Sequence, residues 1–191
     1  MIVLIPSYEP DHKLCRLVES LCATPGDHRV LVVNDGSDPR FDEVFDEVRL
    51  SGAIVVEHRP NRGKGYALKR GFRYISEHFP GEDVVCADSD GQHTVTDILA
   101  IAAEIDSHRD LIVLGARGFT GEIPLRSRFG NAATRIALRV ASGLRLQDTQ
   151  TGLRAYPAAL LPWLGTIEGE RFEYELNVLL QAKRRNISVV E

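Results

Sequence analysis

Short, uninterrupted apolar runs alternate along this chain with segments in which apolar residues recur at helical spacing. Val, Ile, Leu and Ala fill the runs at residues 2–5, 30–33, 53–56 and 111–114. Runs of this kind are typical of strands that are buried on both faces of a parallel sheet. Parallel strands need a crossover between them, and the helical segments supply it. The pattern therefore predicts an α/β fold in which a mostly parallel central sheet is flanked by helices.

The alternation of apolar runs and helical spacing is less regular in the second half of the chain. The glycine-containing stretch 117–123 has few apolar residues and is predicted to be a loop. The polar stretch 148–154 is predicted to be a turn, and a last strand begins in residues 187–191. Ending there suggests that the chain continues or was trimmed. The predicted helices are residues 14–22, 41–48, 68–75, 98–105, 128–140 and 172–183.

The totals favour one globular domain that works inside the cell. A length of 191 residues suits a single domain, 1–191, and a net charge of −4 argues against a general nucleic-acid binder. Cys15, Cys22 and Cys86 form no C-x-x-C pair, which indicates a reduced, cytoplasmic environment. The N-terminus lacks the basic region of a signal peptide, and no apolar run approaches the roughly 18 residues that span a bilayer. Any membrane contact is therefore expected to be peripheral, at the cytoplasmic face.

A further apolar run, residues 84–87, lies between the third and the last of these runs and is followed by two carboxylates one residue apart, Asp88 and Asp90, and then by Gln92 and His93. In open α/β sheets, ligands bind beyond the carboxyl ends of the strands. Two hard carboxylate oxygens, with the Gln92 oxygen as a further ligand, suit Mg²⁺ or Mn²⁺ carrying a substrate diphosphate. A solvated Asp-Gly turn is the alternative. His93 either ligates the metal or caps the helix that begins near Thr94.

Spacing separates three chemistries for this acidic turn. An EF-hand needs Gly and Glu at its sixth and twelfth positions, where counting from Asp88 gives His93 and Leu99. An aspartyl-phosphatase motif needs Thr or Val where Gln92 stands. The candidate that remains is glycosyl transfer, in which a divalent cation stabilises the charge of the departing nucleoside diphosphate. Either Asp88 or Asp90 would hold the ion.

Seven short motifs, nearly all after predicted strands, make the chain resemble glycosyltransferase family 2, and within it the polyprenyl- or dolichyl-phosphate hexose synthases. Each motif alone is commonplace, but their order along nearly the whole chain is specific. The resemblance implies a Rossmann-like GT-A fold, transfer from a nucleotide sugar and inversion at the sugar carbon. The motifs are Ile5-Pro-Ser-Tyr-Glu9, Val33-Asn-Asp-Gly-Ser37, Asn61-Arg-Gly-Lys-Gly65, Asp88-Ser-Asp-Gly-Gln-His93, Gly115-Ala-Arg117, Asp148-Thr-Gln-Thr-Gly-Leu-Arg154 and Arg171-Phe-Glu-Tyr-Glu175.

The resemblance assigns donor contacts to residues that follow the predicted strands. Asp35 is expected to accept hydrogen bonds from the base or a ribose hydroxyl. Lys64 is expected to neutralise phosphate or touch the base, and a solvated lysine is the alternative. Ordinary strand-exit turns remain the alternative for the others. The expected donor-binding residues are Pro6, Ser7, Glu9, Asp35, Lys64, Asp88, Gln150 and Arg154.

The acceptor is expected on the side of the glycine-containing loop. Arg117, Arg126 and Arg128 are candidates for binding a lipid phosphate, because guanidinium groups bind phosphate bidentately. Asp148 is a candidate general base or orienting carboxylate, and Asp90 is the second catalytic candidate. A phosphate acceptor is already anionic and needs no strong base, which leaves the role of Asp148 open. Glu173 and Glu175 belong to the last motif and lie in the last predicted helix. A solvated acidic helix face is a serious alternative to a role in the site for both.

The sequence thus predicts a metal-dependent inverting glycosyltransferase, using Mg²⁺ or Mn²⁺, that moves a hexose from a UDP- or GDP-sugar to a polyprenyl phosphate at the membrane surface. Two alternatives stay open. One keeps the transfer and changes the acceptor to a sugar, a protein or a small molecule. The other is a non-catalytic module that binds nucleotide sugars.

Overall fold

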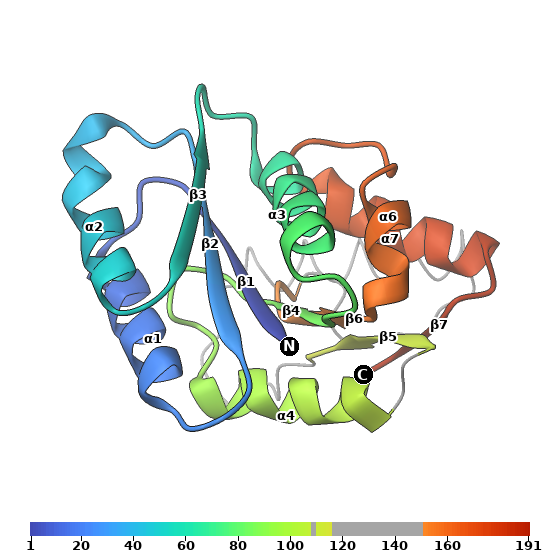
Figure 1. Cartoon of the computed structure of the whole chain (residues 1–191). Helices are drawn as coiled ribbons and strands as arrows, with labels where there is room; N and C mark the ends of the chain where they lie inside the picture. Colours follow the sequence, from blue (N-terminus) through green and yellow to red (C-terminus); the bar gives the residue numbers. More distant parts are fainter. Residues whose placement is uncertain (108–109, 116–150) are drawn as a thin grey trace, which may run out of the picture.

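The computed structural model describes residues 1–107, 110–115 and 151–191, and its strands form one seven-stranded sheet (Figure 1). The strand order is β3-β2-β1-β4-β6-β5-β7. Neighbouring strands are parallel except at β6, which runs antiparallel to both β4 and β5. The strands are β1 Ile2–Ser7, β2 Arg29–Asp35, β3 Ile54–His58, β4 Val84–Cys86, β5 Leu111–Leu114, β6 Arg154–Tyr156 and β7 Ser188–Val190.

Helices cover both faces of this sheet, as the alternation of strands and helices predicts. Helices α1, α2 and α4 pack on one face, and α3, α6 and α7 pack on the other (Figure 1). The helices are α1 His12–Ala23, α2 Asp42–Leu50, α3 Lys64–His78, α4 Val95–Ser107, α6 Leu161–Leu164 and α7 Glu173–Arg184, with short 3₁₀ turns at Pro39–Phe41 and Ala158–Leu160.

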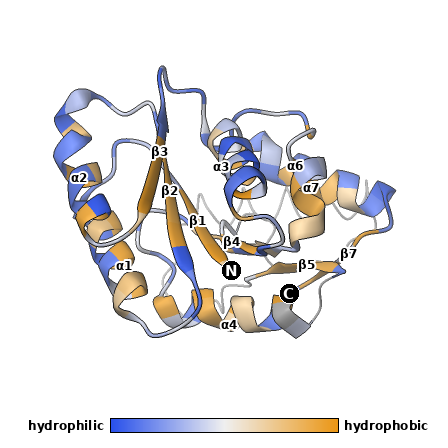
Figure 2. Cartoon of the chain, in the orientation of Figure 1, coloured by the Kyte–Doolittle hydropathy of each residue, from blue (hydrophilic) through white to orange (hydrophobic). Residues whose placement is uncertain are grey.

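The core is divided between the two faces by the period of the strands. In β1, Ile2 and Leu4 face the side of α3 and α7, whereas Val3 and Ile5 face the side of α1 and α4. All four side chains are fully buried, which explains the uninterrupted apolar run. Figure 2 shows β1, β2 and β3 as largely hydrophobic ribbons, while the helices carry bands of both hydrophobic and hydrophilic residues. In the described part of the chain, no helix is both long and apolar enough to cross a membrane.

The α/β architecture predicted from the sequence is confirmed, and one local prediction is wrong. Residues 148–154 were expected to form a turn through Arg154, but Arg154 begins β6. The backbone of Arg154 is paired with Cys86 of β4 on one side and with Leu114 of β5 on the other. A strand of three residues is too short to show period-2 alternation, so the sequence pattern could not reveal it.

Candidate active site

The carboxyl ends of β1, β2 and β4 meet at one edge of the sheet, where the predicted donor-binding residues follow their strands. Strand β1 ends at Ser7 opposite Asn34 of β2, and β4 ends two residues before Asp88. Because parallel strands end on the same side, the loops after them form one surface. This edge is the candidate active site.

Lys64 joins the acidic turn to a glutamate far along the chain. Its ammonium Nζ lies 2.7 Å from Asp88 Oδ1 and 3.0 Å from Glu175 Oε2. Lys64 is the first residue of α3, and Glu175 lies in the first turn of α7. Burial lowers the pKa of Lys64, but the two carboxylates raise it by more, so the ammonium stays charged.

Arg154 balances the second carboxylate of this cluster. It is 1% exposed, and its Nε lies 3.7 Å from Glu175 Oε1. The Arg154 guanidinium also donates to the backbone oxygens of Thr151 (2.9 Å) and Glu175 (2.8 Å). Two cations, Lys64 and Arg154, therefore neutralise the two carboxylates, as burial of charge requires. The burial of Arg154 favours a supporting role behind Glu175, and direct contact with a diphosphate stays a prediction.

Asp88 is held in its charged form. Burial raises its pKa, but the side chains of His93 and Lys64 lower it by more, so the pKa of Asp88 lies well below its usual range. His93 is buried, and its Nε2 lies 3.6 Å from Asp88 Oδ2. The helix after the turn is capped instead by Thr94 and Asp97, which exchange side-chain to backbone hydrogen bonds. The alternative that His93 only caps this helix is therefore wrong.

The outer part of the acidic turn is exposed and held together by its own side chains. Asp90 accepts a hydrogen bond from the backbone N–H of Gln92 (3.0 Å) and another from its side-chain amide (2.5 Å). Gly91 between them has φ of +75°, a conformation that L side chains rarely adopt. Asp90 and Gln92 thus stand at the surface, while Asp88 faces inward toward Lys64.

Gly152 brings the segment before β6 against the acidic turn. A Cβ atom on Gly152 would lie 2.0 Å from Asp88 Oδ2, a distance that no real contact has. The glycine in the Asp148–Arg154 motif is therefore needed so that its backbone can approach the carboxylate. The structure places the end of this motif beside Asp88, as expected if the motif and the turn act in one site.

Asp35 holds the loop that leads into α3. Its Oδ1 accepts from His58 Nε2 and the Arg62 backbone, and its Oδ2 accepts from the Asn61 side chain and the Gly63 backbone, all at 2.8–2.9 Å. The Asp35 residue is 3% exposed. These hydrogen bonds give Asp35 a structural role, because they fix the loop that directly precedes Lys64. Contact of Asp35 with a base or ribose stays a prediction.

The other predicted donor residues lie at the mouth of β1. Pro6 and Ser7 are buried at the end of the strand. Glu9 follows with φ of 47°, and its backbone N–H donates to Ser37 Oγ at 2.9 Å. The loops after β1 and β2 are therefore bonded to each other. Tyr8, which lies between Ser7 and Glu9 in the chain, is 51% exposed and presents an aromatic ring to solvent at this edge.

Five of the predicted site residues belong to the stretch 116–150. Arg117, Arg126, Arg128, Asp148 and Gln150 lie outside the described residues, so their roles stay predictions. Glu175 is a residue of the site that the sequence pattern did not distinguish from its neighbour Glu173. A solvated acidic face was a serious alternative for Glu173 and Glu175, and only Glu173 is exposed. The resemblance of Arg171–Glu175 to a family motif was the one available signal.

Comparison with known proteins gives the chain a family and relatives. The family model described as "Glycosyl transferase family 2" matches residues 2–160. The chain is 25% identical over 209 residues to a UDP-N-acetylglucosamine–dolichyl-phosphate N-acetylglucosaminyltransferase of Methanococcus voltae, covering 99% of this chain and 82% of that protein. It is 24% identical over 207 residues to a polyprenol monophosphomannose synthase of Mycolicibacterium smegmatis, covering 100% and 74%.

A solved structure shares the fold. It is a mannosyltransferase from Pyrobaculum calidifontis in complex with GDP-Man and Mn²⁺, with a TM-score of 0.62 at 21% identity. The comparison covers the whole of this chain but 56% of the mannosyltransferase chain. The likeness therefore concerns the GT-A domain, since the solved chain is considerably longer.

Proposed function

Because this chain belongs to glycosyltransferase family 2, we propose that it is a metal-dependent, inverting hexosyltransferase that uses a UDP- or GDP-sugar and a polyprenyl phosphate acceptor. The family makes the chain a glycosyltransferase, which favours an enzyme over a binding module. Two relatives are named for lipid-phosphate acceptors, which supports that acceptor class. The proposed donor is either UDP-linked or GDP-linked, because one relative is named for UDP-N-acetylglucosamine and one structural neighbour holds GDP-Man.

The acidic turn fits a divalent cation that is shared with a substrate. Asp88 is ionised and partly exposed, and the exposed Asp90 adds a second carboxylate on the same turn. Mg²⁺ and Mn²⁺ are commonly bound by one or two carboxylates together with phosphate oxygens. Asp88 and Asp90 would hold the ion, and Gln92 is the further candidate ligand. When bound, the ion supplies Lewis-acid stabilisation of the charge on the departing diphosphate.

Lys64 is placed to act on the same diphosphate. Its ammonium already lies at the inner side of Asp88, and Glu175 holds it from behind. A diphosphate bound at the turn would bring phosphate oxygens to this ammonium and add a charge-assisted hydrogen bond. Glu175 and Arg154 then keep Lys64 in place, so the positive charge needs little reorganisation during the reaction.

The transfer itself is a single displacement. A phosphate oxygen of the acceptor forms a bond to the anomeric carbon while the bond from that carbon to the diphosphate breaks on the opposite face, which inverts the configuration. Arg117, Arg126 and Arg128 are the proposed acceptor-phosphate ligands. Asp148 is the proposed orienting carboxylate, and the contact of Gly152 with Asp88 supports its motif being close to the reaction. Pro6, Ser7, Glu9 and Asp35 are the proposed base and ribose pocket.

The observation that carries this proposal is the meeting of Asp88, Lys64 and Gly152 at the carboxyl edge of the sheet. The test is calorimetric titration with UDP, GDP and other nucleotides, with and without Mn²⁺. We expect one base to be preferred and Mn²⁺ to strengthen its binding. Absence of any nucleotide binding would refute the proposal. Asp90→Asn should weaken the effect of Mn²⁺ while the protein still unfolds cooperatively.

The acceptor is tested separately with a short-chain polyprenyl phosphate and a labelled donor. Formation of a glycosyl phospholipid supports the proposed acceptor at the membrane surface. Transfer to a sugar, peptide or small molecule instead would keep the enzyme class and change the acceptor. Binding of the donor without transfer to any of these would leave the module as the better description.

A further inference from the structure

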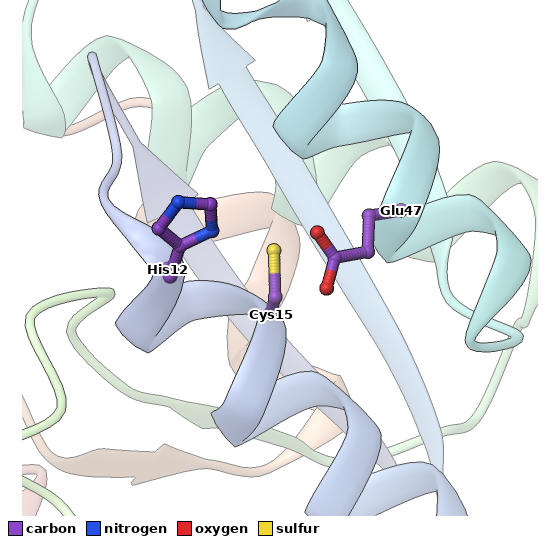
Figure 3. A group of neighbouring side chains, drawn as sticks. All are labelled: His12, Cys15 and Glu47. Atoms are coloured by element: carbon purple, nitrogen blue, oxygen red, sulfur yellow. The ribbon is translucent and has the colours of Figure 1, made fainter.

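A histidine, a cysteine and a glutamate from two neighbouring helices meet on the sheet face covered by α1 and α2. His12 and Cys15 lie on α1, and Glu47 lies on α2. An imidazole nitrogen, the sulfur and a carboxylate oxygen all lie within 4.8 Å of one another. Figure 3 shows the sulfur of Cys15 between the His12 ring and the Glu47 carboxylate. None of the three has a role in the proposed glycosyl transfer.

The local structure explains why these side chains converge. His12 and Cys15 are three residues apart on one helix, so they share a face, and α2 packs against that face. Cys15 is 3% exposed and has little freedom to move. His12 and Glu47 are exposed, so they can rotate toward the sulfur at small cost.

The thiol of Cys15 is buried beside a carboxylate. Its sulfur lies 3.8 Å from the backbone oxygen of Val44, which is a weak contact. Burial and then the neighbouring carboxylate of Glu47 raise the pKa of Cys15 to about 11. The sulfur is therefore a neutral thiol in this structure, and the case for a metal site rests on the convergence of the three ligand atoms.

We propose that His12, Cys15 and Glu47 bind one Zn²⁺ ion, with the fourth position open to water. Zinc accepts imidazole nitrogen, thiolate sulfur and carboxylate oxygen at about 2.0–2.3 Å in tetrahedral sites. Those bond lengths place neighbouring ligand atoms roughly 3.5 Å apart, so closing from at most 4.8 Å takes about 1 Å of side-chain movement. The thiolate and the carboxylate together neutralise the dication.

The ligand types separate this site from the acidic turn. Sulfur and nitrogen ligands favour zinc, whereas the carboxylates of the turn favour Mg²⁺ or Mn²⁺. The zinc would join α1 to α2 and so fix the start of α1. Lys13 there packs against the turn, since a Cβ on Gly91 would lie 3.3 Å from the Lys13 Cβ. The proposed zinc site uses these three residues alone and is independent of the proposed reaction.

The experiment uses Co²⁺ as a spectroscopic substitute for zinc, added to the whole chain without nucleotide. Cobalt bound by a thiolate has a charge-transfer band in the near ultraviolet, which oxygen ligands do not produce. We expect the band to saturate at one equivalent and to be displaced by Zn²⁺. Cys15→Ser should remove it, and Cys22→Ser, which changes the exposed thiol on the same helix, should leave it intact.

Two further variants guard against failure of Cys15→Ser to fold. Glu47→Gln and His12→Ala change exposed side chains, and each should weaken zinc binding at least about tenfold, because even second-sphere partners contribute that much. Glu43→Gln, an exposed carboxylate on the same helix, is the control and should bind zinc as the wild type does. Absence of a thiolate band in the wild type would overturn the proposal. An undiminished band in both Glu47→Gln and His12→Ala would also overturn it, because the ligand would then be a lone thiol.

Discussion

The ammonium of Lys64 lies 2.7 Å from a carboxylate oxygen of Asp88, the residue that we propose as a metal ligand. A protein cation therefore already neutralises the carboxylate at which a second cation is proposed to bind. Glu175, 3.0 Å away on the other side, offers Lys64 an alternative partner. A metal ion and Lys64 compete for Asp88, and the anionic donor relieves the competition because it attracts both cations. Metal and donor are thus expected to strengthen each other's binding.

Replacing Lys64 separates these effects. In Lys64→Met, we expect the nucleotide Kd to rise at least about tenfold, since a charge-assisted hydrogen bond to phosphate contributes roughly 1.5–3 kcal/mol. Binding of Mn²⁺ alone should become tighter, because its competitor at Asp88 is gone. Calorimetric titration of each ligand measures both changes. Lys183→Met, an exposed lysine in the last turn of α7, is the control. Weaker Mn²⁺ binding in Lys64→Met would contradict the competition.

Glu175→Gln should reduce both stability and metal affinity. The change leaves Lys64 and the buried Arg154 with Asp88 as the one remaining carboxylate of the cluster, and breaking buried pairs of this kind costs about 3–5 kcal/mol. Because the cluster is partly exposed at Asp88, we expect about 2–3 kcal/mol. Urea unfolding measures the loss, and Mn²⁺ titration should show weaker binding because Lys64 stays on Asp88.

The matched control for that change is Glu173→Gln on the same helix. Glu173 is exposed and accepts hydrogen bonds from the backbone of Glu170 and Arg171, so its loss should matter much less. Equal destabilisation by the two variants would show that Glu175 contributes only as a helix residue. The ion pairs of Glu175 with Lys64 and Arg154 would then contribute nothing measurable to stability.

Gly152→Ala should lower the rate of transfer because it displaces the carboxylate of Asp88. The added methyl group would overlap the carboxylate oxygens of Asp88 at 2.0 and 2.4 Å, so either Asp88 or the backbone before β6 must move. A displacement of about 1 Å at a reacting centre costs on the order of a hundredfold in rate. Initial-rate measurements of donor hydrolysis or transfer test this. Gly165→Ala, where the nearest atom is 3.4 Å away and φ is −61°, should keep near wild-type activity.

Acid should destabilise the fold partly through Asp88. Burial raises its pKa, but His93 and Lys64 lower it by more, so the folded pKa lies below the unfolded value of about 3.9. A carboxyl with a lowered pKa stabilises the fold at pH values above the unfolded pKa, and that contribution is lost as pH falls through the folded pKa. We expect the free energy of unfolding to fall below about pH 4, with a shallower fall in Asp88→Asn. Urea unfolding between pH 7 and pH 2.5 measures both. A fall of equal steepness in Asp88→Asn would assign the acid sensitivity to other groups.

The sequence was informative where polar residues directly follow an uninterrupted apolar run. The runs at residues 2–5 and 30–33 were recognisable as buried strands, and parallel pairing then required the polar residues that follow them to meet. Asp88 was placed correctly at the end of its strand for the same reason. These inferences depend only on local pattern and on the geometry of parallel sheets, so no long-range packing had to be known.

The cluster around Glu175 depends on packing that no local pattern records. Its burial follows from the close approach of α7 to the start of α3, where a Cβ on Gly65 would lie 2.5 Å from the Tyr174 Cβ. From the sequence, Glu173 and Glu175 are equivalent acidic residues in a first helical turn. Only the tertiary contact distinguishes the one that meets Lys64 and Arg154 from the one that meets solvent.

The antiparallel course of β6 has a consequence for the chain between β5 and β6. Strand β5 delivers the chain to Gly115 at the edge of the active site, and Leu153 returns beside it, with Gly115 N–H donating to the Leu153 oxygen at 2.8 Å. Gly115 and Leu153 are thus hydrogen-bonded to each other at the same edge of the sheet. A change in the length of the intervening segment therefore need not alter the pairing of β5 with β6 or the position of the carboxylates after β4.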